Sequence, residues 1–145
     1  CGFRTEDGVW FLADCLTSDA VIEKYHVQFL YDVAAYLETL DRVSQLEGRL
    51  FVPAHAEATE NIRPLAERNR AKVLEVAELL VKFCRELQGF EELLQQVFSH
   101  YHLTMDFNQY VLVGSTIRSY LSYLLDQGQV STDFTQDGRL LWKAL

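Results

Sequence analysis

The amino-acid sequence predicts an α+β fold, and three observations support this prediction. In the first part of the chain, two short β-prone segments are each followed by a helical pattern of apolar residues. A glycine at position 89 ends the longest helical pattern, and two more helical patterns and a hairpin signal follow it. We therefore predict two domains, residues 1–88 and 89–145, which the length of 145 residues allows.

The first part opens with a predicted β-hairpin. Asp7-Gly8 is a typical hairpin turn, and the run Val9–Ala13 that follows it is rich in residues that favour strands. The predicted buried strand therefore ends on the carboxylate of Asp14.

A helix, a second strand and a long helix complete the first part. Apolar residues recur at helical spacing over residues 32–48, and the short apolar strand 49–55 ends on His55. The pattern over 61–86 predicts a helix that tolerates Pro64, because a proline in the first turn removes no hydrogen bond of the helix.

The second part is predicted to be a small winged-helix-like domain. Helical patterns cover 90–100 and 108–126, and a hairpin forms around Asp137-Gly138. The longer helix has one basic residue, Arg118, and residues 89–145 carry 3 basic against 6 acidic residues. Because groove binding needs arginine and lysine to neutralise phosphates, no nucleic-acid partner is expected.

Composition limits the class of protein further. The chain has 21 acidic and 13 basic residues and a net charge of -8, and its longest apolar run is far shorter than a membrane span. No signal peptide is evident. The negative charge and the short apolar runs predict no membrane partner. The three cysteines (Cys1, Cys15 and Cys84) are odd in number and lack CxxC spacing, which predicts reduced thiols in a cytoplasmic protein.

Two residues could carry chemistry, Asp14 and His55. Each is a metal-capable side chain at the predicted end of a strand, and carboxylate and imidazole are good ligands for zinc or manganese. Spacing alone leaves a structural alternative open, in which the aspartate forms a turn and the histidine is a packed residue.

The segments Gly2–Leu16, Arg49–His55 and Ala66–Arg70 resemble the C-terminal half of a metallo-β-lactamase superfamily hydrolase. In that family one strand ends in a metal-bridging aspartate and a later strand ends in Pro-Gly-His-Gly, whose histidine binds the second metal. Asp14 and His55 match these positions. The sequence departs from the pattern where alanine replaces glycine, at Ala13, Ala54 and Ala56.

The resemblance implies the second half of an αββα sandwich followed by a winged-helix-like domain. The intact enzyme would use two divalent ions, with zinc the expected metal, and a metal-bound hydroxide would attack an ester, thioester, lactam or phosphoester of a small-molecule substrate. The family's upstream histidine cluster is absent, so the chain is predicted to be an inactive fragment that binds no metal tightly. His100, His102 and Asp106 imitate part of that cluster and are interpreted as a decoy. The alternative function is a non-catalytic winged-helix interaction module.

The resemblance also implies partners and a substrate cleft. Half a sandwich would leave one apolar sheet face uncovered, which predicts a homodimer or pairing with the missing N-terminal half. The residues expected to be partly uncovered are Phe11, Leu12, Phe51 and Val52. Tyr25 and His26, in the predicted loop after Asp14, are the candidate substrate-binding residues, with packing and solvated roles as the alternative.

Overall fold

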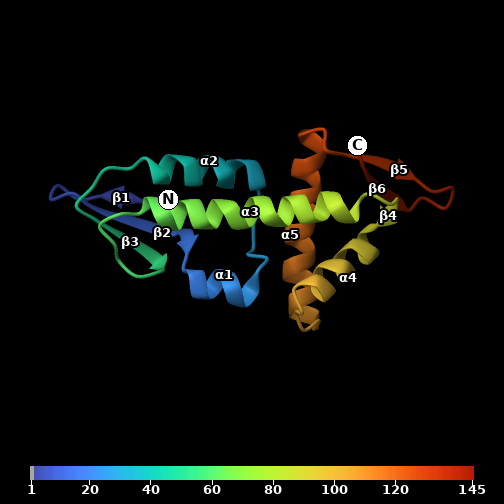
Figure 1. Cartoon of the computed structure of the whole chain (residues 1–145), viewed down its shortest axis with the longest axis horizontal. Coiled ribbons are helices and arrows are strands. Elements are labelled where there is room, and N and C mark those ends of the chain that lie inside the picture. Colours follow the sequence, from blue (N-terminus) through green and yellow to red (C-terminus); the bar gives the residue numbers. More distant parts are fainter. Residues whose placement is uncertain (1) are drawn as a thin grey trace. The chain divides into compact units, whose positions relative to one another are not determined.

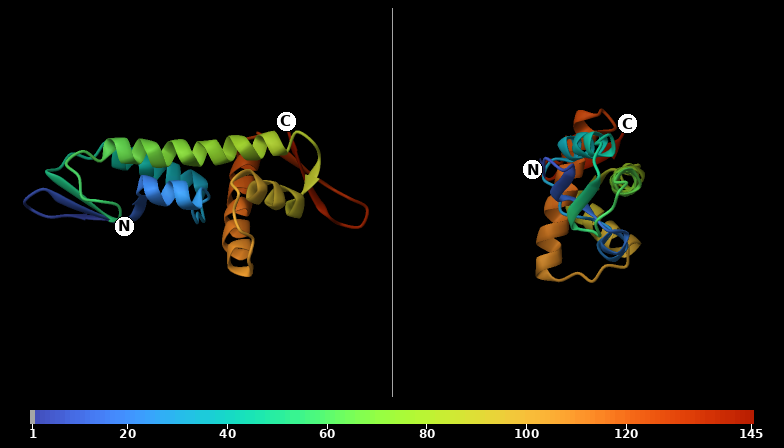
Figure 2. Two further views of the ribbon diagram at one scale, coloured as in Figure 1. Left: turned by 60° about the horizontal axis from the view of Figure 1, so that its bottom comes forward. Right: turned by 90° about the vertical axis from the view of Figure 1, so that its left-hand side faces the viewer.

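The computed structural model describes residues 2–145 and has the predicted α+β architecture (Figure 1). The chain divides into two compact units, one comprising residues up to His26 and Ala34–Val73, the other Val27–Val33 and Leu74–Leu145. The division falls inside α3 (Arg63–Phe83), which is one continuous helix (Figure 2). The domain boundary between residues 88 and 89 stays a prediction.

The first unit contains a three-stranded sheet in the order β1-β2-β3. β1 (Phe3–Arg4) and β2 (Val9–Thr17) form an antiparallel hairpin whose turn contains Asp7-Gly8, and Gly8 has a positive φ of 85°, which glycine adopts without strain. β3 (Leu50–His55) pairs parallel with β2. Each element predicted for this sheet is therefore present.

The outer edge of β3 is partly closed by a loop residue. Phe51 and Thr59 exchange two backbone hydrogen bonds, with N···O distances of 2.8 and 2.9 Å. Thr59 lies between β3 and the start of α3, so the chain itself pairs with the edge of its own sheet.

β2 is longer than the sequence analysis predicted. The strand does not end at Asp14 but continues to Thr17, and its register against β3 shifts between Phe11 and Ala13 and again between Ala13 and Thr17. The prediction of a strand ending on Asp14 is therefore wrong in its bounds. In place of a strand end, the structure has two register shifts on either side of Ala13, the residue before Asp14.

Three helices accompany this sheet. α2 (Val33–Ser44) and α3 were predicted, and α3 starts where the Asn61 side chain accepts a hydrogen bond from the Arg63 amide at 3.2 Å. α1 (Asp19–Tyr25) was predicted to be a loop. It has seven residues, of which only Ile22 is buried, so it shows almost no apolar periodicity.

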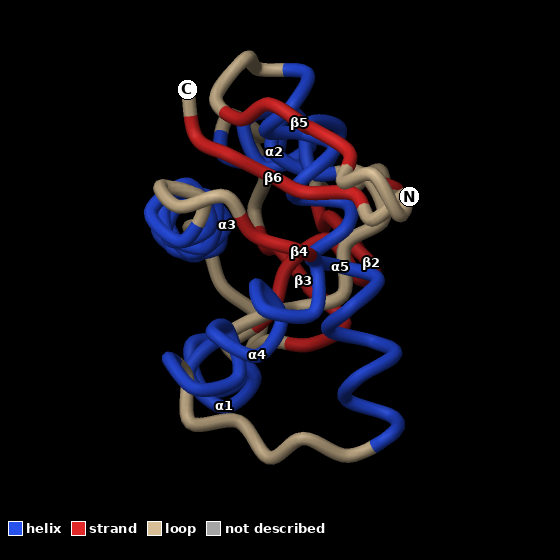
Figure 3. The backbone as a smooth tube through the Cα atoms, turned by 90° about the vertical axis from the view of Figure 1, so that its right-hand side faces the viewer, coloured by secondary structure: helices blue, strands red, loops and turns tan. Residues whose placement is uncertain are grey.

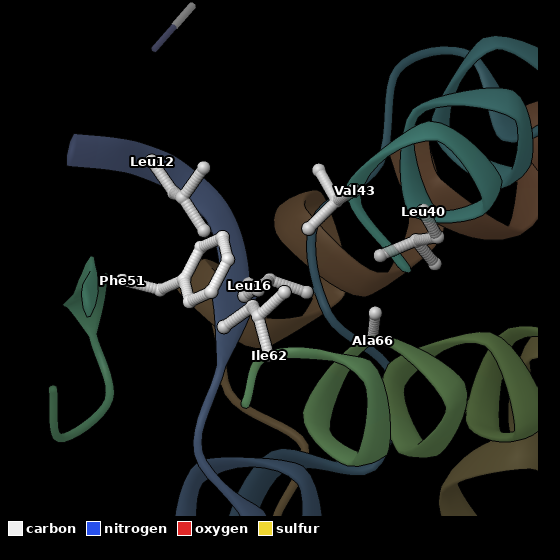
Figure 4. Close-up of a cluster of buried hydrophobic side chains, with 7 residues drawn as sticks. All are labelled: Leu12, Leu16, Leu40, Val43, Phe51, Ile62 and Ala66. Atoms are coloured by element: carbon white, nitrogen blue, oxygen red, sulfur yellow. The ribbon is translucent and has the colours of Figure 1, made fainter. Parts of the chain in front are cut away.

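The core of the first unit lies between the sheet and the helices α2 and α3. Side chains from β2, β3, α2 and the start of α3 point toward one another there (Figure 4): Leu12, Leu16, Leu40, Val43, Phe51, Ile62 and Ala66. Leu12 and Phe51, expected to be partly uncovered, are 4% and 2% exposed, because they lie on the sheet face that the helices cover. Phe11 is 38% exposed and Val52 is half-buried, as predicted.

The second unit contains a sheet of order β4-β6-β5 and the helices α4 (Phe90–His100) and α5 (Phe107–Asp126), which can be followed in Figure 3. β5 (Val130–Phe134) and β6 (Leu140–Ala144) form the predicted hairpin. β4 (Gln88–Gly89) was not predicted. Two residues are too few to show strand periodicity.

No helix among residues 2–145 is both long and apolar enough to span a membrane. Cys15 and Cys84 are free thiols, and Cys1 lies outside the described residues. Burial raises the pKa of the Cys84 thiol to about 11, so this side chain is a packed apolar group at neutral pH.

Candidate metal centre

Asp14 and His55 are brought together by the parallel pairing of β2 and β3 (Figure 1). His55 is the last residue of β3, and its register partner on β2 is Thr17, three residues after Asp14. The Nε2 atom of His55 lies 3.4 Å from Oδ1 of Asp14. The side chains of His55 and Asp14 are 57% and 83% exposed, so both are open to solvent.

The backbone conformation of Ala13 explains how Asp14, a residue within a strand, comes close to His55. Ala13 has a φ of 47°, in the left-handed region that costs a residue with a Cβ about 1–2 kcal/mol. This turn of the chain coincides with the two register shifts of β2. The glycine that the family pattern expects at position 13 is thus favoured by the backbone, whereas Ala54 and Ala56 have no positive φ.

The two side chains fit a divalent cation as two of its ligands. Bonds of about 2.1 Å to oxygen and nitrogen in a tetrahedral zinc site place neighbouring ligand atoms about 3.4 Å apart. The observed separation of 3.4 Å equals this value. Among residues 2–145 no group of three or more histidine, cysteine, aspartate or glutamate side chains could hold a metal ion.

A cavity of about 1050 Å³ lies beside His55. It is walled by the start of α1, the loop after β3 and the first turns of α3. Its one arginine, Arg68, contacts Asp19 at 3.2 Å and Glu23 at 3.7 Å. Two carboxylates thus offset the positive charge at this wall.

Tyr25 and His26 do not line this cavity. Tyr25 ends α1 and lies under the Lys24 ammonium, 4.9 Å from the ring centroid. His26 caps the helix with a φ of 52° and places its Nδ1 atom 3.3 Å from Nζ of Lys72. They therefore occupy a helix end, not the loop that the sequence analysis predicted, and their role in substrate binding stays a prediction.

The residues that imitate the family's histidine cluster have structural partners. Asp106 caps α5, since its side chain accepts a hydrogen bond from the Gln109 amide at 2.8 Å. The His100 ring contacts Phe83 and Tyr101 edge to face.

Sequence reasoning missed the role of Asn69. This residue of α3 is 1% exposed and contacts Thr17 and Tyr36 with its side-chain amide. An asparagine inside a long helix, on the face that also carries Ala66 and Val73, was the available signal, because a buried amide must find hydrogen-bond partners.

The sequence matches no protein-family model and no curated protein. Solved structures are similar: a beta-lactamase domain protein from Burkholderia ambifaria has a TM-score of 0.78 at 19% identity, with 100% of this chain and 44% of that chain covered. A metallo-beta-lactamase family protein from Thermus thermophilus has a TM-score of 0.72 at 19% identity, with 99% and 44% covered. The chain therefore shares its fold with a part of these proteins and spans less than half of their length.

Proposed function

We propose that the chain is the C-terminal portion of a metal-dependent hydrolase, with Asp14 and His55 as two of the metal ligands. The observation that carries the proposal is the 3.4 Å separation of Oδ1 and Nε2 on two adjacent strands. The fold likeness to metallo-beta-lactamase proteins supports it. The substrates would be small molecules with an ester, thioester, lactam or phosphoester bond.

Each residue has a defined part in this proposal. Asp14 contributes a negative charge and an oxygen donor, and His55 contributes a neutral nitrogen donor, from side chains that solvent already reaches. When bound, zinc or another divalent ion supplies a Lewis acid that polarises the scissile bond and lowers the pKa of water. The remaining ligands would come from polypeptide outside residues 2–145, and we expect these residues alone to bind metal weakly and to be inactive.

The rest of the architecture is consistent with this proposal. The sheet of the first unit would be the second sheet of an αββα sandwich, with Phe3, Phe11 and Val52 in register on the face away from the helices. The sheet β4-β6-β5 with α4 and α5 would form a winged-helix-like domain. DNA binding is not part of the proposal, because the guanidinium of Arg118 lies 3.5 Å from the centroid of the Phe90 ring.

A zinc titration followed by NMR tests the ligand assignment. The chain has 4 histidines, so each imidazole signal can be assigned by substitution. We expect zinc to shift the His55 ring signals at concentrations that leave His100 and His102 unchanged, and Asp14→Asn to weaken this response. Asp106→Asn is the matched control, since it removes an exposed carboxylate from the decoy motif and should leave the response intact.

The hydrolase assignment needs a second experiment. A longer polypeptide that includes an upstream histidine cluster should bind zinc tightly and cleave a generic ester, and Asp14→Ala and His55→Ala should abolish both properties. Equal zinc affinity in the substituted and unsubstituted proteins would refute the role of both residues. The interaction-module alternative predicts that outcome.

A further inference from the structure

The side chain of Asn69 uses its complete hydrogen-bonding capacity inside the first unit. Its Nδ2 atom donates to the backbone oxygens of Thr17 at 2.9 Å and Leu65 at 2.8 Å. Its Oδ1 atom accepts from the Thr17 amide and hydroxyl, both at 3.1 Å, and from the Tyr36 hydroxyl at 3.4 Å. A 1% exposed amide with all these partners is held in one orientation.

The contact with Thr17 has the pattern of a strand pairing. One side-chain amide binds both the N–H and the C=O of a single residue, as a neighbouring strand would in a ladder. β2 needs such support, because its register against β3 is irregular between Ala13 and Thr17. Asn69 therefore pairs with β2 on the edge away from β3, at a position beyond Trp10 and Phe11, with which β1 is in register.

The hydrogen bonds between Asn69 and Thr17, called the tether below, act on the segment that carries Asp14. Thr17 is the register partner of His55, and the next amide, that of Ser18, donates to the His55 oxygen at 3.0 Å. Asp14 lies between the positive-φ residue Ala13 and Thr17. With Thr17 fixed to α3 and paired with His55, the irregular segment of β2 that carries Asp14 has a defined end.

We propose that Asn69 is a positioning residue, which holds Asp14 and His55 at the separation that a shared cation requires. The metal in this statement rests on the proposed function, whereas the tether itself does not. Groups that hydrogen-bond directly to metal ligands typically change metal affinity by about 10–100-fold when they are removed. Asn69 acts one contact further away, through Thr17 and its pairing with His55, so the lower end of this range is expected. Asn69→Ala should therefore raise the zinc concentration that shifts the His55 signals by about tenfold.

Amide hydrogen exchange tests the tether without metal. In Asn69→Ala we expect the Ser18 amide to exchange about tenfold faster than in the unsubstituted chain, relative to the Phe51 amide, which is bonded to Thr59 at 2.8 Å. The exchange rate of the Ser18 amide divided by that of the Phe51 amide, called the Ser18 ratio below, cancels the effect of lower global stability. Asn69→Gln, which retains the amide but moves it by one methylene group, should give the same result and is the second variant if Asn69→Ala does not fold.

Thr116→Val is the matched control. Thr116 is also 1% exposed, and its hydroxyl accepts from the Leu30 amide in the second unit, so the substitution lowers stability at a different place. It should change neither the Ser18 ratio nor the zinc response. If the Asn69 variants behave like Thr116→Val, Asn69 has only a general stabilising role and the inference is wrong.

The two proposals fail in different ways. If zinc never shifts the His55 signals of the unsubstituted chain, the metal function fails, and the Ser18 ratio still decides whether Asn69 holds the strand. If zinc does act through Asp14 and His55 while the Asn69 variants keep full affinity, the positioning role fails and the metal function stands.

Discussion

The imidazole of His55 lies 3.4 Å from the carboxylate of Asp14, although the two residues are distant in the sequence. Both side chains are more than half exposed, and an exposed pair of this kind adds little to stability because water screens it. The fold thus brings two polar groups together at a place where stability does not require them. A function of the pair in metal binding is the proposal made above.

The first prediction separates this function from a structural role. Asp14→Asn and His55→Gln should each change the free energy of unfolding by less than about 1 kcal/mol, because neither side chain is buried. Urea unfolding of the variants measures this change. A loss of several kcal/mol in either variant would favour the structural alternative, in which Asp14 forms a turn and His55 is a packed residue.

The second prediction concerns the backbone at Ala13. Ala13→Gly should stabilise the chain by about 1 kcal/mol, because glycine adopts the observed φ of 47° without a steric penalty. Ala54→Gly is the matched control. Ala54 lies outside the positive-φ region, so its replacement by glycine should lower stability by about 0.5–1 kcal/mol. Similar effects of both substitutions would contradict the assignment of strain to position 13.

The third prediction concerns alkaline pH. Burial raises the pKa of Tyr36 from the ordinary value of 10.0 to about 12. The unfolded chain loses this proton near pH 10 while the folded chain retains it, so the contribution is complete below pH 10 and is lost as pH rises from 10 to about 12. The slope is about 1.4 kcal/mol per pH unit for one such group.

Tyr36→Phe should remove this part of the pH dependence. Unfolding measured at several pH values between neutrality and pH 12 should show a smaller decrease for the variant than for the unsubstituted chain. Tyr31→Phe is the control, because Tyr31 is 88% exposed. Parallel curves for all three proteins would contradict the prediction.

The fourth prediction concerns self-association. Phe3 is 62% exposed, stacks on Phe11 with ring centroids 4.9 Å apart, and belongs to the sheet face opposite the helices. We expect dimers in sedimentation experiments, and Phe3→Ser with Phe11→Ser should shift the chain toward monomer. Tyr31→Ser removes another exposed aromatic ring and should leave the dimer unchanged. A chain that stays monomeric at high concentration would argue against this pairing.

The fifth prediction distinguishes a helix cap from a metal ligand at Asp106. Asp106→Ala should destabilise the chain by about 1 kcal/mol, because the Gln109 amide loses its acceptor, whereas Asp106→Asn should be nearly neutral, since asparagine caps helices equally well. Thermal unfolding measures both. A decrease in zinc binding in either variant would show that the motif is not a decoy.

The sequence predicted the elements with strong periodicity. The long helices and the two hairpins follow from apolar spacing and from Asp-Gly turns, and the bounds of α4 were predicted to the residue. Short elements were missed for a physical reason. Only one residue of α1 is buried and β4 is two residues long, so neither element shows a periodic pattern of apolar residues. Their positions are fixed by caps and partner strands, which the local sequence does not show.

The candidate site was predicted in part. Asp14 and His55 were predicted to be metal ligands, which stays a prediction, and the structure places the two side chains together, but the reason for their proximity was not foreseen. It lies in the backbone of Ala13 and in the contacts of Asn69 with Thr17, a residue 52 positions away along the chain. Periodicity and spacing carry no information on such long-range hydrogen bonds.

The exchange of backbone hydrogen bonds between Phe51 and Thr59 has a consequence for how the sheet can be enlarged. A strand from another polypeptide would have to displace Thr59 to pair along the whole of β3, but not to add next to β1, the opposite border in the order β1-β2-β3. Enlargement of this sheet is therefore favoured on the side of Phe3 and Arg4.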